Sequence, residues 1–145
     1  MKQYNYDERQ LLARGKAYGI GCMAFLSELA IWELLRGTLG VSAEPVGEFL
    51  LLLSIPFAVV LIVCILEDAY DPVDLKPGIA LFTVMPIAAL CMFVMKFTDG
   101  VPMMTDRCLT DDAGLCALYA AWVVVSVVYW IKYAKDTKAE KENRS

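Results

Sequence analysis

The sequence has no histidine among its 145 residues. Histidine is the commonest general base and the commonest metal ligand, so its absence weakens the case for most hydrolytic or metal-dependent enzymes. The five cysteines include no C-x-x-C pair, the spacing typical of thiol oxidoreductases and zinc sites. The chain also has no P-loop and no serine nucleophile motif. These absences predict a protein that is not an enzyme and that has no cofactor and no metal.

Positive charge is scarce as well. The chain has 13 Lys and Arg residues against 17 Asp and Glu, which gives a net charge of -4. A nucleic-acid-binding protein would carry a basic surface, so no nucleic-acid partner is expected. The first ten residues are polar and mixed in sign, and no small-residue cleavage site follows a short apolar core. We therefore expect no cleavable signal, and the first apolar segment should remain as a span.

Long apolar runs dominate the sequence. Hydrophobic residues make up 59% of the chain and the mean hydropathy is +0.54. Each run suits a hydrocarbon core that takes about 20 helical residues, and backbone groups in lipid must be satisfied within the segment. The sequence therefore predicts an all-α integral membrane four-helix bundle in a single membrane domain, in contact with the lipid bilayer. Its expected spans are residues 17–36, 46–66, 77–96 and 112–133.

The distribution of Lys and Arg predicts the orientation. Ten of the 13 lie in the segment before the first span, in the loop after the second span, or at the end of the fourth span and in the tail that follows it. Positive residues concentrate on the cytoplasmic side of bilayer proteins. We expect a multi-pass membrane protein with both termini cytoplasmic, including an amphipathic arm at 1–16 and a basic tail at 134–145.

The arm favours a helix that runs on from the first span. Asp7 and Gln10 have the spacing of a capping pair, and no proline interrupts the chain before Leu35. A helix of that length exceeds the thickness of the core, so a cytoplasmic helical extension is expected.

The arm and the inner loop carry opposite charges on the same side of the membrane. We expect Arg14 or Lys16 to meet an acid of the loop; solvated flanks with pairs worth about 0–1 kcal/mol are the alternative. The predicted cytoplasmic charge cluster comprises Arg9, Arg14, Lys16, Glu67, Asp68 and Asp71.

The segments YDERQLLARGKAYG, before the first span, and EDAYDP, after the second, resemble motifs of a family of small four-span membrane proteins. That family comes mostly from Gram-positive bacteria and is defined only as a domain of unknown function. The resemblance covers both motifs and the layout of the spans, which is nearly the whole chain. It implies a bacterial membrane location, and it brings no reaction and no catalytic residues.

Glu28 stands near the middle of the first expected span. A carboxylate there costs about 2.5–3.5 kcal/mol or more, and no basic residue lies at matching depth, so we expect the protonated form. It has two interpretations: a buried hydrogen-bonding group, or a proton site such as the single glutamate in the first of the four spans of small multidrug exporters. Candidate partners for its carboxyl group are Ser54, Thr83, Tyr119 and Ser126. Midway along the second and third spans, Pro56 and Pro86 should each leave one helix carbonyl without its donor.

The loop between the third and fourth spans holds four aspartates and one cysteine, with another cysteine just beyond. Cys108 and Cys116 could form a disulfide, unless Cys116 is already inside the fourth helix. The aspartates match no calcium-loop spacing, so we expect Asp111 or Asp112 to cap the fourth helix. Near the other outer loop, Glu33 and Arg36 should form an i,i+3 pair.

These observations support two functions. The first is a non-enzymatic interaction or regulatory protein whose cytoplasmic face docks a membrane or cytoplasmic protein partner; a homo-oligomer is equally compatible with the sequence. The alternative is a small proton-coupled transporter that uses Glu28. Substitutions at Glu28 and at Arg14 should distinguish them.

Overall fold

The computed structural model describes residues 8–69 and 75–144 of the chain, without the side chains of 75–80, 140, 143 and 144. Asp7, Asp71 and the first seven residues of the expected arm lie outside the described residues. The protein is all-helical, as predicted. Its helices are α1 (Glu8–Leu39), α2 (Pro45–Leu66), α3 (Leu75–Thr98) and α4 (Asp111–Arg144).

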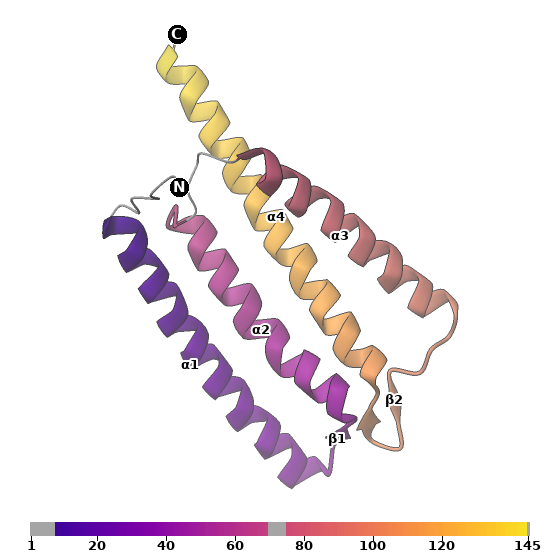
Figure 1. Ribbon diagram of the computed structural model, residues 1–145. Helices are drawn as coiled ribbons and strands as arrows, with labels where there is room; N and C mark the ends of the chain where they lie inside the picture. The colour runs from indigo at the N-terminus through magenta and orange to yellow at the C-terminus, as the bar shows by residue number, and fades with distance from the viewer. Residues whose placement is uncertain (1–7, 70–74, 145) are drawn as a thin grey trace, which may run out of the picture.

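All four helices are long and apolar enough to cross a membrane. The first and last helices of the chain are much longer than a bilayer core is thick. Helix α1 has 32 residues and α4 has 34, or about 50 Å each at 1.5 Å per residue. The described parts of the expected arm and of the expected tail, residues 8–16 and 134–144, are continuous with their spans. The last turns of α4 continue beyond the other helices (Figure 1).

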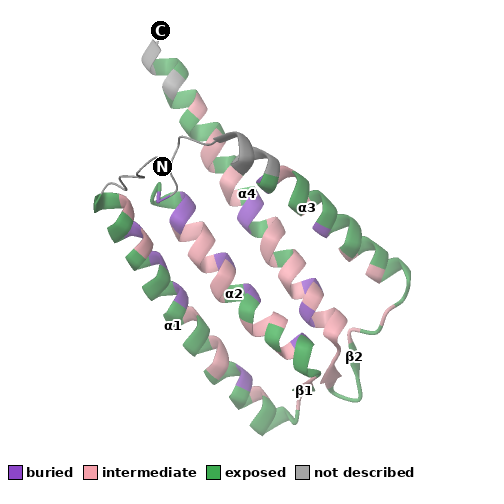
Figure 2. Cartoon of the chain, viewed as in Figure 1, coloured by how far each residue is buried: buried purple, intermediate pink, exposed green. Residues whose placement is uncertain are grey.

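The helices of this bundle lie side by side in the order α1–α2–α4–α3. The extensive helix contacts join α1 to α2, α2 to α4, and α4 to α3, which leaves α1 and α3 at the two edges (Figure 1). Buried residues accordingly follow the facing sides of the helices, and much of the remaining surface is exposed (Figure 2).

Two small cores hold the row together. Between α1 and α2 the buried cluster consists of small side chains, which allow the two backbones to approach closely. It contains Ala13, Ala17, Cys64 and Ala69. Farther along α1, a Cβ atom on Gly21 would overlap the side chain of Val60. The second cluster joins the other three helices and contains Ala58, Ile65, Phe82 and Val125.

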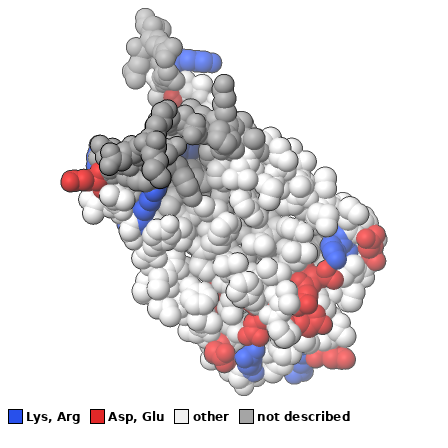
Figure 3. Space-filling view, viewed as in Figure 1, with Lys and Arg blue, Asp and Glu red and all other residues white. Residues whose placement is uncertain are grey.

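The two ends of the row differ in structure. At one end, here named the loop end, β1 (Ser42–Ala43) pairs in parallel with β3 (Cys108–Leu109), and β2 (Met104–Thr105) pairs with β3 antiparallel. The sequence analysis predicted no strands. The opposite end, where α1 begins and α4 projects, is named the terminal end. On the face drawn in Figure 3, charged side chains gather at both ends and the middle is almost entirely uncharged.

Candidate functional site

At the terminal end, α1 is held against the chain that follows α2. Lys16 Nζ lies 2.5 Å from Glu67 Oε1, so one of the expected arm–loop ion pairs is present. Arg14 Nε donates to the backbone oxygen of Ala69 at 2.9 Å. Arg14 thus contacts the chain that follows α2 through a backbone carbonyl.

The end of α2 explains where that carbonyl lies. Asp68 adopts a left-handed conformation with φ 52°, and the Ala69 amide donates to Cys64 O at 3.0 Å. This bond is the one that closes a Schellman motif, in which a left-handed residue ends the helix. The turn brings Ala69 into the buried cluster with Ala13 and Ala17 and so next to α1.

Asp68 joins the other side of the row. Lys132 of α4 donates to Ile65 O at 2.6 Å and to Leu66 O at 3.2 Å, and it forms an ion pair with Asp68. An ammonium group is favourable at a helix C-terminus, where carbonyls lack amide donors. Asp68, one of the three acids expected as alternatives for the arm, thus pairs with Lys132 of α4.

The predicted cluster has two further members. Arg9 lies in the first turn of α1 with an exposed side chain, and Asp71 lies outside the described residues. Together, Arg14, Lys16 and Lys132 tie α1 and α4 to the same end of α2. We name this set of contacts the terminal clasp.

Beyond the terminal clasp, α4 continues as a charged helix. Lys135, Asp136, Lys138 and Glu142 are exposed, and the last two form an i,i+4 pair at 3.9 Å. The segment expected as a basic tail is therefore an uninterrupted continuation of the fourth span. Its position is fixed at its base by Lys132.

At the loop end, Glu48 in the first turn of α2 binds two side chains of α1. Its carboxylate accepts from Trp32 Nε1 at 2.7 Å and from Arg36 at 2.8 and 2.9 Å. Arg36 also lies 3.5 Å from Glu33, which confirms the i,i+3 pair but makes it the longer of the two contacts. The sequence analysis missed Glu48, although an acid in the first turn of a helix was a visible signal.

The N-termini of α2 and α4 cap each other. Glu44, before α2, accepts from the Asp111 amide at 2.8 Å, and Asp111 accepts from the Gly47 amide at 2.6 Å. Thr110 Oγ1 accepts from the Ala113 amide at 3.4 Å and is the local cap of α4. The prediction that Asp111 or Asp112 caps α4 is therefore wrong, because these two carboxylates bind neighbouring helices.

Glycine makes this crossing possible. A Cβ atom on Gly114 would overlap the backbone oxygen and Cα of Gly47, so the two helices touch through their main chains. Beside them, Asp112 binds Lys96 at 2.5 Å and joins α4 to α3. We name these contacts, from Glu48 to Lys96, the loop-end network.

The remaining sequence candidates on this side make no chemical site. Among the residues that the structure describes, no group of three or more Cys, Asp or Glu could hold a metal ion. Cys108 and Cys116 are both free thiols, so the disulfide considered from the sequence is not formed. Cys116 is buried inside α4, whereas Cys108 lies on β3. The helical alternative for Cys116 is the correct one.

Glu28 lies on the stripe of α1 that contains Gly21 and Trp32, the side that packs against α2. Its Oε2 atom is buried and has no hydrogen-bond partner among the residues that the structure describes. Two of the expected partners have other acceptors: the Ser54 hydroxyl donates to Leu51 O and the Ser126 hydroxyl to Trp122 O. One oxygen of the Glu28 carboxyl group is thus buried without a hydrogen bond, in contrast to the interpretation of Glu28 as a buried hydrogen-bonding group.

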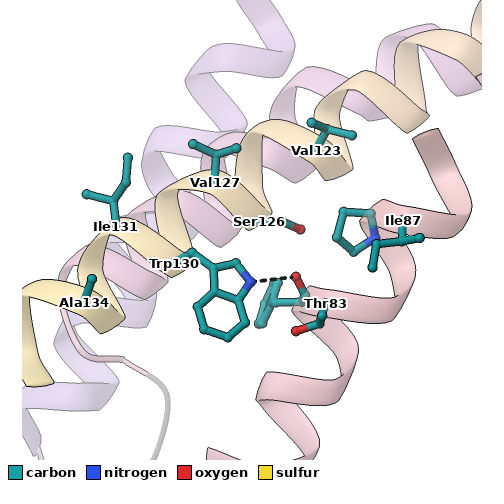
Figure 4. A pocket seen from close by; sticks show the side chains of 10 residues that line it. Thr83, Ile87, Val123, Ser126, Val127, Trp130, Ile131 and Ala134 are labelled. Atoms are coloured by element: carbon teal, nitrogen blue, oxygen red, sulfur yellow. Dashed lines mark hydrogen bonds between the residues drawn. The ribbon is translucent and has the colours of Figure 1, made fainter.

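A groove of about 500 Å³ runs between α3 and α4, in the half of the row nearer the terminal end. Pro86 lies beside it and has no amide hydrogen to offer the Phe82 carbonyl four residues earlier. Trp130 of α4 supplies the missing donor, with Nε1 3.2 Å from Phe82 O (Figure 4). One of the carbonyls predicted to be freed by proline is therefore satisfied across the helix interface.

Comparisons with models of protein families, with curated proteins and with solved structures find no match to this chain. The resemblance to the small four-span family stays a prediction. The functional argument consequently depends on the geometry of the two ends and of the polar groups between them.

Proposed function

We propose that this chain is a multi-pass protein of a bacterial plasma membrane, with the terminal end in the cytoplasm, and that it works as a non-enzymatic docking component for a protein partner. The observation that carries the proposal is the extension of α4: a charged helix that projects past the row and is fixed at its base by Lys132. The excess of Lys and Arg in the arm, the inner loop and the tail supports this orientation.

The extension is suited to binding a protein. Its exposed side chains carry both signs of charge, which favours a specific partner of complementary pattern. Because the helix is continuous with a span and clasped to α2, its orientation is set before the partner arrives. Binding then loses less conformational entropy than it would with a flexible tail.

The test exchanges two neighbouring charges on the extension without changing net charge. The variant carries Lys135→Glu and Asp136→Lys, both at exposed positions. Crosslinking in native membranes, followed by purification, should capture a partner with the unmodified chain and lose it with the exchange. The control is Asp99→Asn, an exposed position at the loop end. Retention of the same partner by the exchange variant, or loss with the control as well, would contradict docking on this helix.

The orientation has a test of its own. A cysteine introduced at Lys141 should react with a membrane-impermeant maleimide only after the cells are opened, and one introduced at Asp99 should react in intact cells. The reverse pattern would overturn the proposed orientation.

Proton-coupled transport is the second candidate function, and Glu28 is the observation in its favour. A buried carboxyl oxygen with no hydrogen bond, on a helix that could cross a membrane, is a group that can gain or lose a proton. Proton flux in proteoliposomes that is lost with Glu28→Gln and kept with Arg14→Ala would favour transport. Partner capture that is lost with Arg14→Ala and kept with Glu28→Gln would favour docking.

A further inference from the structure

The groove between α3 and α4 has an apolar lining in a part of the molecule that lies within the spans. Ile87 of α3 and Val123, Val127 and Ile131 of α4 line it, and Trp130 closes one side (Figure 4). Its volume, about 500 Å³, is within the range of about 300–1,000 Å³ typical of small-molecule sites. A ligand there would be apolar over the length of the groove.

Two polar groups of the groove already have hydrogen-bond partners within the protein. The Phe82 carbonyl, which Pro86 leaves without a helix donor, is bound by Trp130, and the Ser126 hydroxyl donates to Trp122 O. A buried polar group that is already satisfied needs no partner from a ligand. The groove is therefore better suited to a hydrocarbon chain than to a polar solute.

Positive charge begins where the apolar lining ends. The residues of α4 that line the groove recur at intervals of three and four, which places them on one face of the helix. Continuing the same spacing past Ala134 reaches Lys138 and Lys141, both exposed. Along this face, the order is Val123, Val127, Trp130, Ala134, Lys138 and Lys141.

The distances suit a phospholipid. At 1.5 Å per residue, Lys138 and Lys141 lie about 6 and 10 Å along the axis beyond Ala134. The headgroup layer is about 5–8 Å thick on each side of the hydrocarbon core. If the core ends at Ala134, the backbone of Lys138 lies within this layer, and that of Lys141 lies just outside it with a side chain long enough to reach back. Lys138 forms an ion pair with Glu142 at 3.9 Å, and its side chain is 80% exposed.

We propose that the α3–α4 groove is a binding site for one anionic phospholipid, with an acyl chain along the groove and the phosphate at Lys138 and Lys141. The occupant is inferred from the continuity of an apolar groove with two lysines on the same helix face. The site needs neither the docking function nor a particular orientation, because it can be measured in a symmetric bilayer.

Trp130 gives the experiment its signal. The purified protein is placed in nanodiscs that contain brominated phosphatidylglycerol or brominated phosphatidylcholine at increasing mole fraction. Bromine quenches indole fluorescence at contact, and subtraction of a Trp130→Phe variant isolates this residue from Trp32 and Trp122. The brominated phosphatidylglycerol should reach half-maximal quenching at a mole fraction roughly tenfold lower than brominated phosphatidylcholine, because each lysine near an anionic lipid contributes severalfold to affinity.

A matched pair of variants separates the site from general charge. Lys138→Gln with Lys141→Gln should abolish the preference for phosphatidylglycerol. Lys135→Gln with Arg107→Gln removes the same number of positive charges elsewhere and should retain it. Equal quenching by the two lipids in the unmodified protein, or equal loss of preference in both double variants, would overturn the proposal. Absence of quenching by either lipid would also overturn it, since it would mean that protein covers the groove.

Discussion

At the two ends of the helix row, side chains of opposite charge hold the helices together. At the loop end, carboxylates of Glu44 and Asp111 bind backbone amides at the N-termini of α4 and α2. At the terminal end, Lys132 and Arg14 bind backbone carbonyls at and just beyond the C-terminus of α2. Each sign of charge lies where the helix leaves the opposite partial charge unsatisfied.

The two ends also differ in how closely the helix backbones approach each other. The loop end brings main chain against main chain at Gly47 and Gly114, with a small sheet closing over it. The terminal end depends on long side chains, and Lys16 and Glu67 are 58% and 42% exposed. We therefore expect contacts at the loop end to contribute more to the stability of the fold than contacts at the terminal end.

The largest effect should come from the glycine crossing. Gly114→Ala puts a methyl group into the backbone of Gly47, which cannot move aside as a flexible side chain could, and should destabilise the protein by about 3 kcal/mol or more. The measurement is the thermal midpoint in detergent, read by size-exclusion fluorescence. Gly37→Ala is the matched control, since a Cβ atom there meets nothing within 4 Å, and should be neutral or stabilising by up to about 1 kcal/mol. Equal midpoints for the two variants would refute the role of close approach.

Removal of the Glu48 charge should have the next largest effect. Glu48→Gln weakens three hydrogen bonds from Trp32 and Arg36, and charge-assisted bonds contribute about 1.5–3 kcal/mol. Urea unfolding followed by Trp fluorescence should show this loss. Glu33→Gln, whose contact with Arg36 is 3.5 Å and exposed, should change stability by less than about 0.5 kcal/mol. A larger loss with Glu33→Gln would reverse our assignment of the important acid.

At the terminal end, Lys132→Met should cost about 1 kcal/mol. Loss of the ammonium group leaves two carbonyls of α2 and the Asp68 carboxylate without their donor. The methionine side chain keeps the apolar packing of the lysine stem. The same unfolding experiment measures it, with the exposed Lys135→Met as control. If the loss exceeds that of Glu48→Gln, then the terminal end is the more rigid of the two.

The smallest effect belongs to the exposed pair of Lys16 and Glu67. A double-mutant cycle with Lys16→Gln and Glu67→Gln should give a coupling of about 0–1 kcal/mol that falls as salt is raised. Coupling that persists in 1 M salt would mean that this pair is shielded from water, and the contrast between the ends would be weaker than we propose.

The spans were predictable because hydropathy is a local property. The four apolar runs correspond to α1–α4, and the expected starts at 46 and 112 lie within one residue of Pro45 and Asp111. The helix ends outside the bilayer were not predictable to the same degree. The sequence ends the fourth span at 133, whereas α4 continues to Arg144, since polar helix and polar tail have the same composition.

The contacts between helices depend on packing that one sequence does not specify. Hydropathy cannot say that α4 lies between α2 and α3, so the partners of Glu44, Asp111 and Lys132, more than 60 residues away, were not predictable. Of the described contacts between helices, the Lys16–Glu67 pair alone could be anticipated, because it joins two oppositely charged segments that the distribution of Lys and Arg predicts on one side of the membrane. For the contacts at the loop end, the available signal in the sequence was the acidic residues in the first turns of α2 and α4.

The reciprocal capping of α2 and α4 bears on how the chain assembles. The bonds from Gly47 and Asp111, and the parallel pairing of β1 with β3, all join the hairpin of α1 and α2 to the hairpin of α3 and α4. Neither hairpin alone can complete these bonds. The first hairpin alone therefore leaves the Glu44 carboxylate and the Gly47 amide without these partners. The second hairpin supplies the partners when the two dock, and this selects the register between the hairpins.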